Sequence, residues 1–202
     1  MRVFLFRHTE AVDAGAATDA DRWLTPAGRK AARKAAKRLR RLDVRWDSVL
    51  TSPLVRAVQT AEIAAARLKG KAAVTVADCL RPGKGSWDAF RAAAAATGGA
   101  AVALVGHEPD LGAAVGQALG TAPIALAKGA IAALEVDKGG KVTSFGLLAP
   151  GAEDWAPLSG PPAARPVAKA AKAKPAVKAP VSKAKPPAAK PARASRTRAT
   201  RS

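Results

Sequence analysis

The sequence predicts an α/β fold, a three-layer α/β/α sandwich with a mostly parallel central sheet. Two observations predict it: apolar runs typical of strands alternate with helical stretches over about the first 150 residues, and 49% of the 202 residues are apolar, enough for one core. Strands and helices that alternate in this way favour parallel strands with helices on both faces of the sheet.

The elements follow from local patterns. Thr25 can cap a helix that has Pro26 at its first position, and the turn-like segment DKGG at 137–140 predicts that the last two strands pair antiparallel. The strands are expected at 3–6, 48–51, 74–76, 101–105, 131–136 and 142–148, and the helices at 26–42, 54–69, 86–97 and 111–119.

The net charge of +19 is concentrated at one end of the chain. Residues 161–202 hold 12 of the 34 Lys and Arg residues, no Asp or Glu, eight prolines and no aromatic residue. Such a segment buries too little apolar surface to offset its ordering entropy, and its prolines interrupt helices. We therefore expect a folded domain at 1–158 and a disordered Ala/Lys/Pro-rich basic tail at 159–202.

The tail resembles the Ala-Lys-Pro-rich arms of linker histones and of some nucleoid-associated proteins. That resemblance implies salt-sensitive, sequence-independent binding of a polyanion such as DNA, RNA or polyphosphate. Base readout is not expected, because the segment has no aromatic side chain for stacking. The alternative is a solubilising extension without a partner.

Several classes of protein are excluded. The single cysteine, Cys79, cannot form a disulfide framework or a Cys-rich metal site. No apolar stretch reaches the roughly 18 residues of a membrane span, and Arg7 ends the first apolar run too early for a secretory signal. We expect a cytoplasmic protein that does not associate with a membrane.

The helix expected at 26–42 is strongly basic. Ala27, Ala31, Ala35, Leu39 and Leu42 are predicted to form its apolar face, with eight Lys or Arg residues elsewhere. These cations form either a solvated surface or a positive field that attracts anionic substrates.

Four side chains follow strand ends. Arg7 and His8 come directly after the first strand, Arg56 lies in the first turn of the helix after the second strand, and His107 follows the fourth strand. In open α/β sheets, ligands bind beyond the carboxyl ends of the strands. These two arginines and the only two histidines are therefore expected to meet in one pocket.

This set of residues suits phosphoryl transfer. Guanidinium groups match phosphate oxygens and supply the positive charge that a metal would otherwise provide. A neutral imidazole can attack phosphorus, and a second imidazole, once protonated, can stabilise the oxyanion. We expect no metal and no cofactor.

The motifs around these residues resemble those of the histidine phosphatase superfamily, which has the phosphoglycerate mutase-like fold, and within it the small SixA-type phosphohistidine phosphatases. The matching segments are LFRHTEA, DRWLTPAGRKAA, VLTSPLVRAVQTAEI and LVGHEPDL. The resemblance spans most of residues 1–150. It implies that His8 is the nucleophile and that Arg7, Arg56 and His107 bind the phosphoryl oxygens, with Arg22 near the pocket.

The chain departs from the family pattern at two points. Thr9 replaces the usual glycine after the histidine, so its backbone should avoid positive φ, and its hydroxyl is a candidate phosphate donor. After the third strand the chain offers Asp78 and no glutamate. Glu10 and Glu108 flank the histidines and are candidates for the acid or for orienting groups.

A site without a well-placed acid favours phosphoramidates, because an alkoxide leaving group needs more protonation than an imidazole. With few residues available for a lid after the second strand, the pocket should be open. We therefore expect a metal-independent phosphatase acting on phosphohistidine of a signalling protein. The alternatives are a small-molecule phosphomonoesterase of the same superfamily, or a polyanion-binding protein with a phosphatase-like domain.

Overall fold

A computed structural model describes residues 1–158 except 69 and 71. The predicted tail at 159–202 lies outside the described residues, so its disorder and the domain boundary at 158 stay predictions. None of the described helices is long and apolar enough to cross a membrane.

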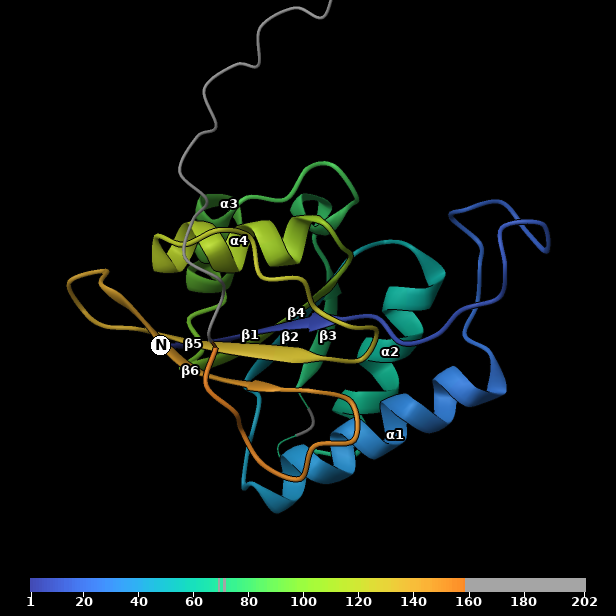
Figure 1. Cartoon of the computed structure of the whole chain (residues 1–202), viewed down its shortest axis with the longest axis horizontal. Helices are drawn as coiled ribbons and strands as arrows, with labels where there is room; N and C mark the ends of the chain where they lie inside the picture. Colours follow the sequence, from blue (N-terminus) through green and yellow to red (C-terminus); the bar gives the residue numbers. More distant parts are fainter. Residues whose placement is uncertain (69, 71, 159–202) are drawn as a thin grey trace, which may run out of the picture. The chain divides into compact units, whose positions relative to one another are not determined.

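The described part of the chain contains a six-stranded sheet in the order β3-β2-β4-β1-β5-β6 (Figure 1). The first four strands in sequence run parallel, whereas β5 is antiparallel to both β1 and β6. The predicted mostly parallel sheet and the antiparallel final pair are thus confirmed. The strands are β1 (Arg2–Arg7), β2 (Ser48–Thr51), β3 (Ala73–Val76), β4 (Ala101–Gly106), β5 (Ile131–Val136) and β6 (Val142–Leu148).

Helices cover both faces of the sheet, which confirms the three-layer arrangement (Figure 1). Helices α1 and α2 pack on one face together with Phe4 and Phe6, and α3 and α4 pack on the other face together with Val3 and Leu5. Neighbouring residues of β1 point to opposite faces, and both faces are buried. The helices are α1 (Pro26–Arg41), α2 (Val55–Ala65), α3 (Trp87–Ala96) and α4 (Asp110–Leu119), with a short 3₁₀ helix, η1 (Asp78–Leu80), after β3.

Helix α1 begins as predicted, but its buried face differs from the expected one. The Thr25 side chain accepts a hydrogen bond from the backbone N–H of Gly28 at 2.9 Å, and Pro26 opens the helix. Ala27 and Ala31, predicted to be buried, are exposed. The buried residues are instead Gly28, Ala32, Ala35, Ala36, Arg38 and Leu39.

Gly28 accounts for the buried face of α1, because its Cα lies directly against the chain that follows β1. A Cβ built at position 28 would lie 2.0 Å from the carbonyl oxygen of Glu10. The same oxygen accepts a hydrogen bond from the N–H of Thr25 at 3.2 Å. The glycine therefore lets the first turn of α1 fix the segment after His8.

Helix α2 ends at Ala65, four residues earlier than predicted. The next hydrogen bonds, from Arg67 N–H to Ala64 and from Leu68 N–H to Ala65, span three residues, so the last turn tightens. Gly70 then takes a φ of 111°, which turns the chain toward β3. The alanine-rich sequence here gave no signal for this stop.

Candidate active site

The sheet order brings three strand ends together. β4 lies between β1 and β2, with Arg7 opposite Gly106 and Thr51 opposite Val105. Beyond the strands, the backbone N–H of His8 donates to the carbonyl of Gly106 at 3.1 Å. The residues that follow β1, β2 and β4 therefore share one edge of the sheet.

At this edge the imidazole rings of His8 and His107 face the same space. Their centroids are 5.0 Å apart and the rings are tilted by 56°. Both residues are buried, with 8% of His8 and 4% of His107 exposed. Two residues 99 positions apart in the sequence thus form one pair, as their strand-end positions predicted.

The hydrogen bond of His8 fixes its tautomer. Nδ1 lies 2.6 Å from the backbone carbonyl oxygen of Thr9, which can only accept a hydrogen bond, so Nδ1 must carry the proton. Nε2 of the neutral ring is then left with a free lone pair. A ring held in this form is suited to attack an electrophile.

Both imidazoles are held in the neutral form. Burial, with smaller contributions from the cations Arg56 and Arg7, lowers the pKa of His8 to about 4. Burial, with smaller contributions from the neighbouring His8 ring and Arg56, which disfavour a second positive charge, lowers the pKa of His107 to about 3. The His8 ring is therefore neutral at pH 7, with a proton on Nδ1 and a lone pair on Nε2.

Ser52 supports the second histidine. Its buried hydroxyl lies 2.9 Å from Nε2 of His107, and its backbone N–H donates to the carbonyl of Val105. Nδ1 of His107 is buried and has no hydrogen-bond partner among the described residues. The sequence analysis did not predict Ser52 as a site residue. Ser52 directly follows β2, so the rule that ligands bind beyond strand ends could have identified it.

Arg7 is connected to the Glu108 carboxylate by two hydrogen bonds through the backbone of Leu126. Its Nη1 donates to the carbonyl of Leu126 at 2.6 Å, and the N–H of Leu126 donates to Oε1 of Glu108 at 3.2 Å. Burial raises the pKa of Glu108. Nε of Arg7 is buried and has no partner among the described residues. Glu108 is thus placed to orient Arg7 indirectly.

Arg56 meets an acidic residue that the sequence analysis missed. Its Nη1 donates to the backbone carbonyl of Asp19 at 2.5 Å, and its Nη2 donates to the Asp19 carboxylate at 3.1 Å. Arg22 also pairs with Asp19, at 3.1 Å, and donates from Nε to the carbonyl of Val12. The hydrogen bond from Arg56, with smaller contributions from its charge and from Arg22, lowers the pKa of the Asp19 carboxyl. Arg22 therefore joins the site through Asp19.

Thr9 is fully buried, and its φ is not positive, as the β-branched side chain requires. Its N–H donates to Oγ1 of Thr60 at 3.3 Å, and the two hydroxyl oxygens are 3.4 Å apart. Thr60 in turn donates to the carbonyl of Arg56. In the described residues, the Thr9 side chain therefore links the His8 segment to α2.

The other two candidate acids lie on the surface. The Glu10 side chain is exposed. Asp78 forms ion pairs with Lys84 at 2.7 Å and with Arg81 at 3.0 Å, and these hydrogen bonds lower its pKa. Asp78 is therefore ionised at neutral pH and unsuited to donate a proton.

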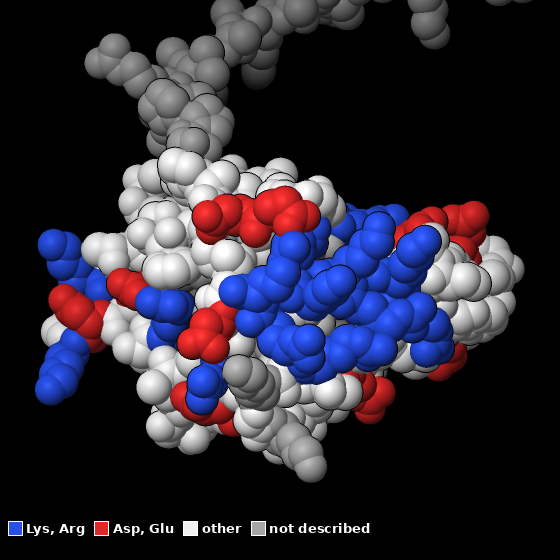
Figure 2. Space-filling model, turned by 90° about the horizontal axis from the view of Figure 1, so that it is seen from below, with Lys and Arg blue, Asp and Glu red and all other residues white. Residues whose placement is uncertain are grey.

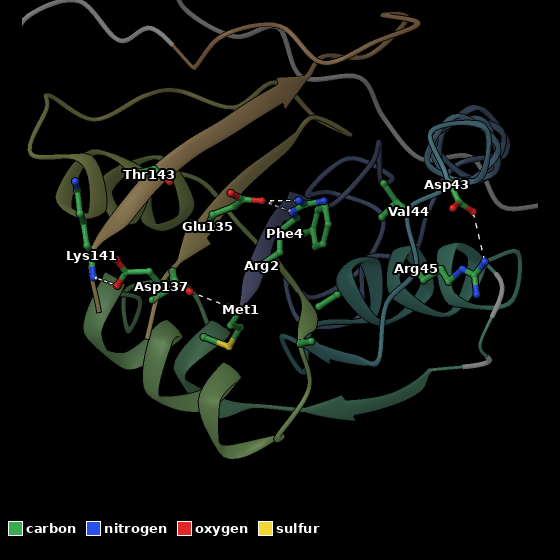
Figure 3. Close-up of a pocket in the computed structure, with 13 residues that line it drawn as sticks. Met1, Arg2, Phe4, Asp43, Val44, Arg45, Glu135, Asp137, Lys141 and Thr143 are labelled. Atoms are coloured by element: carbon green, nitrogen blue, oxygen red, sulfur yellow. Dashed lines mark hydrogen bonds and ion pairs between the residues drawn. The ribbon is translucent and has the colours of Figure 1, made fainter. Parts of the chain in front are cut away.

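A cavity of about 620 Å³ lies at the start of β1, at the opposite end of this strand from His8; Figure 3 shows the residues that line it. It is lined by Met1 and Arg2 at the start of β1, about 20 Å from His8 along the strand. Arg2 pairs there with Glu135, and the terminal amine donates to the carbonyl of Val136. Across residues 1–68, 70 and 72–158, no cluster of three or more His, Cys, Asp or Glu residues could hold a metal ion.

The fold, with two buried histidines paired beyond the carboxyl ends of parallel strands, is that of a phosphatase of the histidine type. The sequence model of the histidine phosphatase superfamily (branch 1) matches residues 3–88. The structure of the protein histidine phosphatase SixA complexed with tungstate is similar, with a TM-score of 0.67 and 32% identity over 74% of this chain and 97% of that one. The chain belongs to the histidine phosphatase superfamily and has its phosphoglycerate mutase-like fold, with SixA-type proteins among its relatives.

Two further relatives show how far the likeness extends. An uncharacterized protein of Picosynechococcus sp. (strain PCC 7002) is 42% identical over 114 residues, which cover 55% of this chain and 69% of that protein. The mitochondrial serine/threonine-protein phosphatase Pgam5 of Drosophila mojavensis is 46% identical over 61 residues, 30% of this chain and only 21% of that protein.

Proposed function

We propose that the protein hydrolyses phosphohistidine on a partner protein through a covalent phosphohistidine intermediate on His8, without a metal ion. The observation that carries this proposal is the pair of neutral imidazoles 5.0 Å apart, with the lone pair of His8 Nε2 free. The superfamily membership supports phosphatase chemistry, and the similarity to SixA supports the choice of substrate.

The reaction has two steps. In the first, Nε2 of His8 attacks phosphorus while the bond from phosphorus to the substrate imidazole breaks, and the leaving nitrogen takes a proton from solvent. In the second, water attacks the phosphoryl group on His8, which releases inorganic phosphate and restores the neutral ring. No oxidant, reductant or cofactor is required.

The cations at the site bind the phosphoryl group. Arg7 and Arg56 supply permanent positive charge, and Nε of Arg7 has no acceptor among residues 1–68, 70 and 72–158. The charge of a bound phosphate raises the pKa of His107, so that this ring gains a proton and donates to the oxyanion. Thr9, Ser52 and Arg22 act as positioning residues for His8, His107 and Arg56.

The carboxylates favour a phosphoramidate substrate. Asp78 is held ionised by Lys84 and Arg81, and Oε1 of Glu108 already accepts the N–H of Leu126. A general acid typically contributes about 10²- to 10⁴-fold to the rate, and alkoxide leaving groups depend on it most. Imidazole leaves more readily, and a site without a free acid suits it.

The variant His8→Asn tests the nucleophile. Asparagine keeps an N–H donor for the Thr9 carbonyl but has no nucleophilic nitrogen, so the fold should be retained while hydrolysis falls at least about 10³-fold. Mass spectrometry of the base-quenched wild-type protein should find the phosphoryl group on His8. Undiminished hydrolysis by the variant, or full loss of wild-type activity in EDTA, would contradict the proposed mechanism.

Substrate preference is tested separately with one enzyme preparation. We expect a larger kcat/KM for a phosphohistidine protein than for phosphoserine or a sugar phosphate. Preference for the esters would favour the second candidate, a small-molecule phosphomonoesterase of the same superfamily. One observation favours that candidate: burial raises the pKa of Glu108, which increases its protonated fraction.

We also propose that the segment at 161–202 binds polyanions. Its twelve Lys and Arg residues, with no carboxylate, give a sequence-independent attraction for DNA, RNA or polyphosphate. A full-length variant with these cations replaced by Gln should elute from a heparin or DNA column at lower salt. Unchanged elution would indicate a solubilising extension.

A further inference from the structure

A second basic surface lies on the folded part of the chain. Figure 2 shows it as a continuous area of Lys and Arg side chains, bordered by scattered acidic residues. At its centre is a groove of about 390 Å³ between α1 and the turn after α2. We call this groove the α1 groove. It is lined by Lys30, Arg33, Lys34, Lys37, Arg40 and Arg67.

The α1 groove carries uncompensated charge. Within residues 1–68, 70 and 72–158, none of its six cations forms an ion pair, whereas Arg2, Arg22 and Arg41 each pair with a carboxylate. The first turn of α1 also contains no acidic residue. The positive potential of the groove is therefore not neutralised by the folded domain itself.

The spacing of these cations opposes helix formation in the free protein. Lys30 lies three and four residues from Arg33 and Lys34, and Lys37 repeats the same spacing to Lys34 and Arg33. Like charges at these separations are neighbours on a helix and repel each other. A bound polyanion would relieve this repulsion, which favours its binding to the free surface.

The dimensions fit a nucleic-acid backbone. From Lys30 to Arg40 the helix advances about 15 Å. One strand of a duplex presents a phosphate about every 3.4 Å along the axis, so this row faces roughly four phosphates with five cations. Arg67, on the other side of the groove, adds a sixth.

The side chains favour a duplex over other partners. The centre of a protein interface is usually depleted of charge and enriched in aromatic residues, and the α1 groove is lined only by cations. Single strands are typically held by stacking on aromatic rings, which the groove lacks. Protein surfaces that bind duplexes are polar and strongly positive.

We propose that the α1 groove binds the phosphate backbone of duplex DNA without sequence specificity, separately from the catalytic edge. This site would act in addition to the segment at 161–202 and belongs to the folded domain. It requires no property of the proposed phosphatase reaction, so either proposal can fail alone.

The test compares two full-length triple variants that remove the same charge. Lys30→Gln/Lys34→Gln/Lys37→Gln alters the groove at three exposed positions where glutamine is a good helix former. Arg91→Gln/Lys138→Gln/Lys141→Gln alters three exposed cations outside the groove. Both variants keep residues 161–202, and circular dichroism and the urea midpoint confirm that each is folded.

Binding of a labelled 24-base-pair duplex is measured by fluorescence anisotropy across a range of salt concentrations. For the groove variant, the slope of log K against log salt should fall in magnitude by about 2 to 3 relative to the unmodified chain, since each lost phosphate contact contributes about 0.9. The affinity should fall roughly 10-fold or more, and the control variant should change far less.

Two results would overturn the proposal. Equal slopes and affinities for the two triple variants would mean that the groove does not contact DNA. If the groove variant lost binding to a poly-glutamate probe and kept its DNA binding, an acidic protein would be the partner instead.

Discussion

The Asp19 carboxylate lies 3.1 Å from Nη2 of Arg56, while the Asp19 backbone carbonyl accepts a hydrogen bond from Nη1 of the same guanidinium. The Arg56 side chain is almost fully buried, and the Asp19 side chain is 64% exposed. An acidic residue on a surface loop therefore shares the guanidinium that we assign to the phosphoryl group.

Replacing Asp19 with Asn should strengthen inhibition by inorganic phosphate. Without the carboxylate, the charge of Arg56 is available to the anion, and because the pair is exposed on the Asp19 side we expect an effect of about 0.5 to 1 kcal/mol, or roughly 2- to 5-fold in the inhibition constant. Asp13→Asn, an exposed acidic residue of the same loop, is the control. Weaker phosphate inhibition in Asp19→Asn would mean that Asp19 orients Arg56 and does not compete for it.

Replacing Ser52 with Ala should lower kcat more than it raises KM. The hydroxyl positions His107 at 2.9 Å, and one such hydrogen bond contributes about 0.5 to 1.5 kcal/mol, so kcat should fall roughly 2- to 13-fold. Ser52→Thr keeps a hydroxyl and should recover part of the rate, and Ser48→Ala, at the start of β2, serves as the control. A normal kcat in Ser52→Ala would remove Ser52 from the site.

Stability should fall as the pH is lowered from about 6.5 toward 4. In the unfolded chain each histidine takes up a proton near pH 6.5, whereas in the folded state the pKa is about 4 for His8 and about 3 for His107. The unfolded state thus binds more protons in this window, and each histidine contributes a slope of up to about 1.4 kcal/mol per pH unit.

Urea unfolding at several pH values measures this dependence. The double variant His8→Asn/His107→Gln should show a flatter curve between pH 6.5 and 4, because both titrating groups are gone. The acid limb of kcat/KM should likewise lie near pH 4. An acid limb near pH 6.5 would show that His8 is not shielded from water as the structure indicates.

Gly28→Ala should destabilise the fold by about 1 to 3 kcal/mol. The added Cβ would collide with the Glu10 carbonyl, which is backbone and cannot rotate away. Gly15→Ala is the matched control, since a Cβ there meets no atom within 4 Å. Equal urea midpoints for the two variants would show that the first turn of α1 can shift without cost.

Much of the fold was predictable because the sequence patterns are local. β5 and β6 have the predicted bounds, since their apolar runs are separated by a turn whose Gly140 has a φ of 83°. The end of α2 was not predictable, because nothing between Ala64 and Leu68 disfavours a helix. The short helix η1 could not be predicted from its three residues either, because it packs against α3 and β4.

The same distinction applies to the site. Arg7, His8, Arg56 and His107 could be grouped in advance because the carboxyl ends of parallel strands share one edge of the sheet. The partners of Arg56 could not, because Asp19 comes from a loop whose path depends on tertiary contacts. The link from Glu108 to Arg7 passes through the backbone of Leu126, and no side-chain pattern reveals it.

The sheet order also has a consequence for protein synthesis. β1 leaves the ribosome first, but its two neighbours, β4 and β5, are translated about 100 and 130 residues later. Until then the first strand has both edges unpaired, and contacts of such large sequence separation form slowly. A nascent chain that stalls before residue 101 should therefore lack enzymatic activity and should need a chaperone to shield its exposed N-terminal strand.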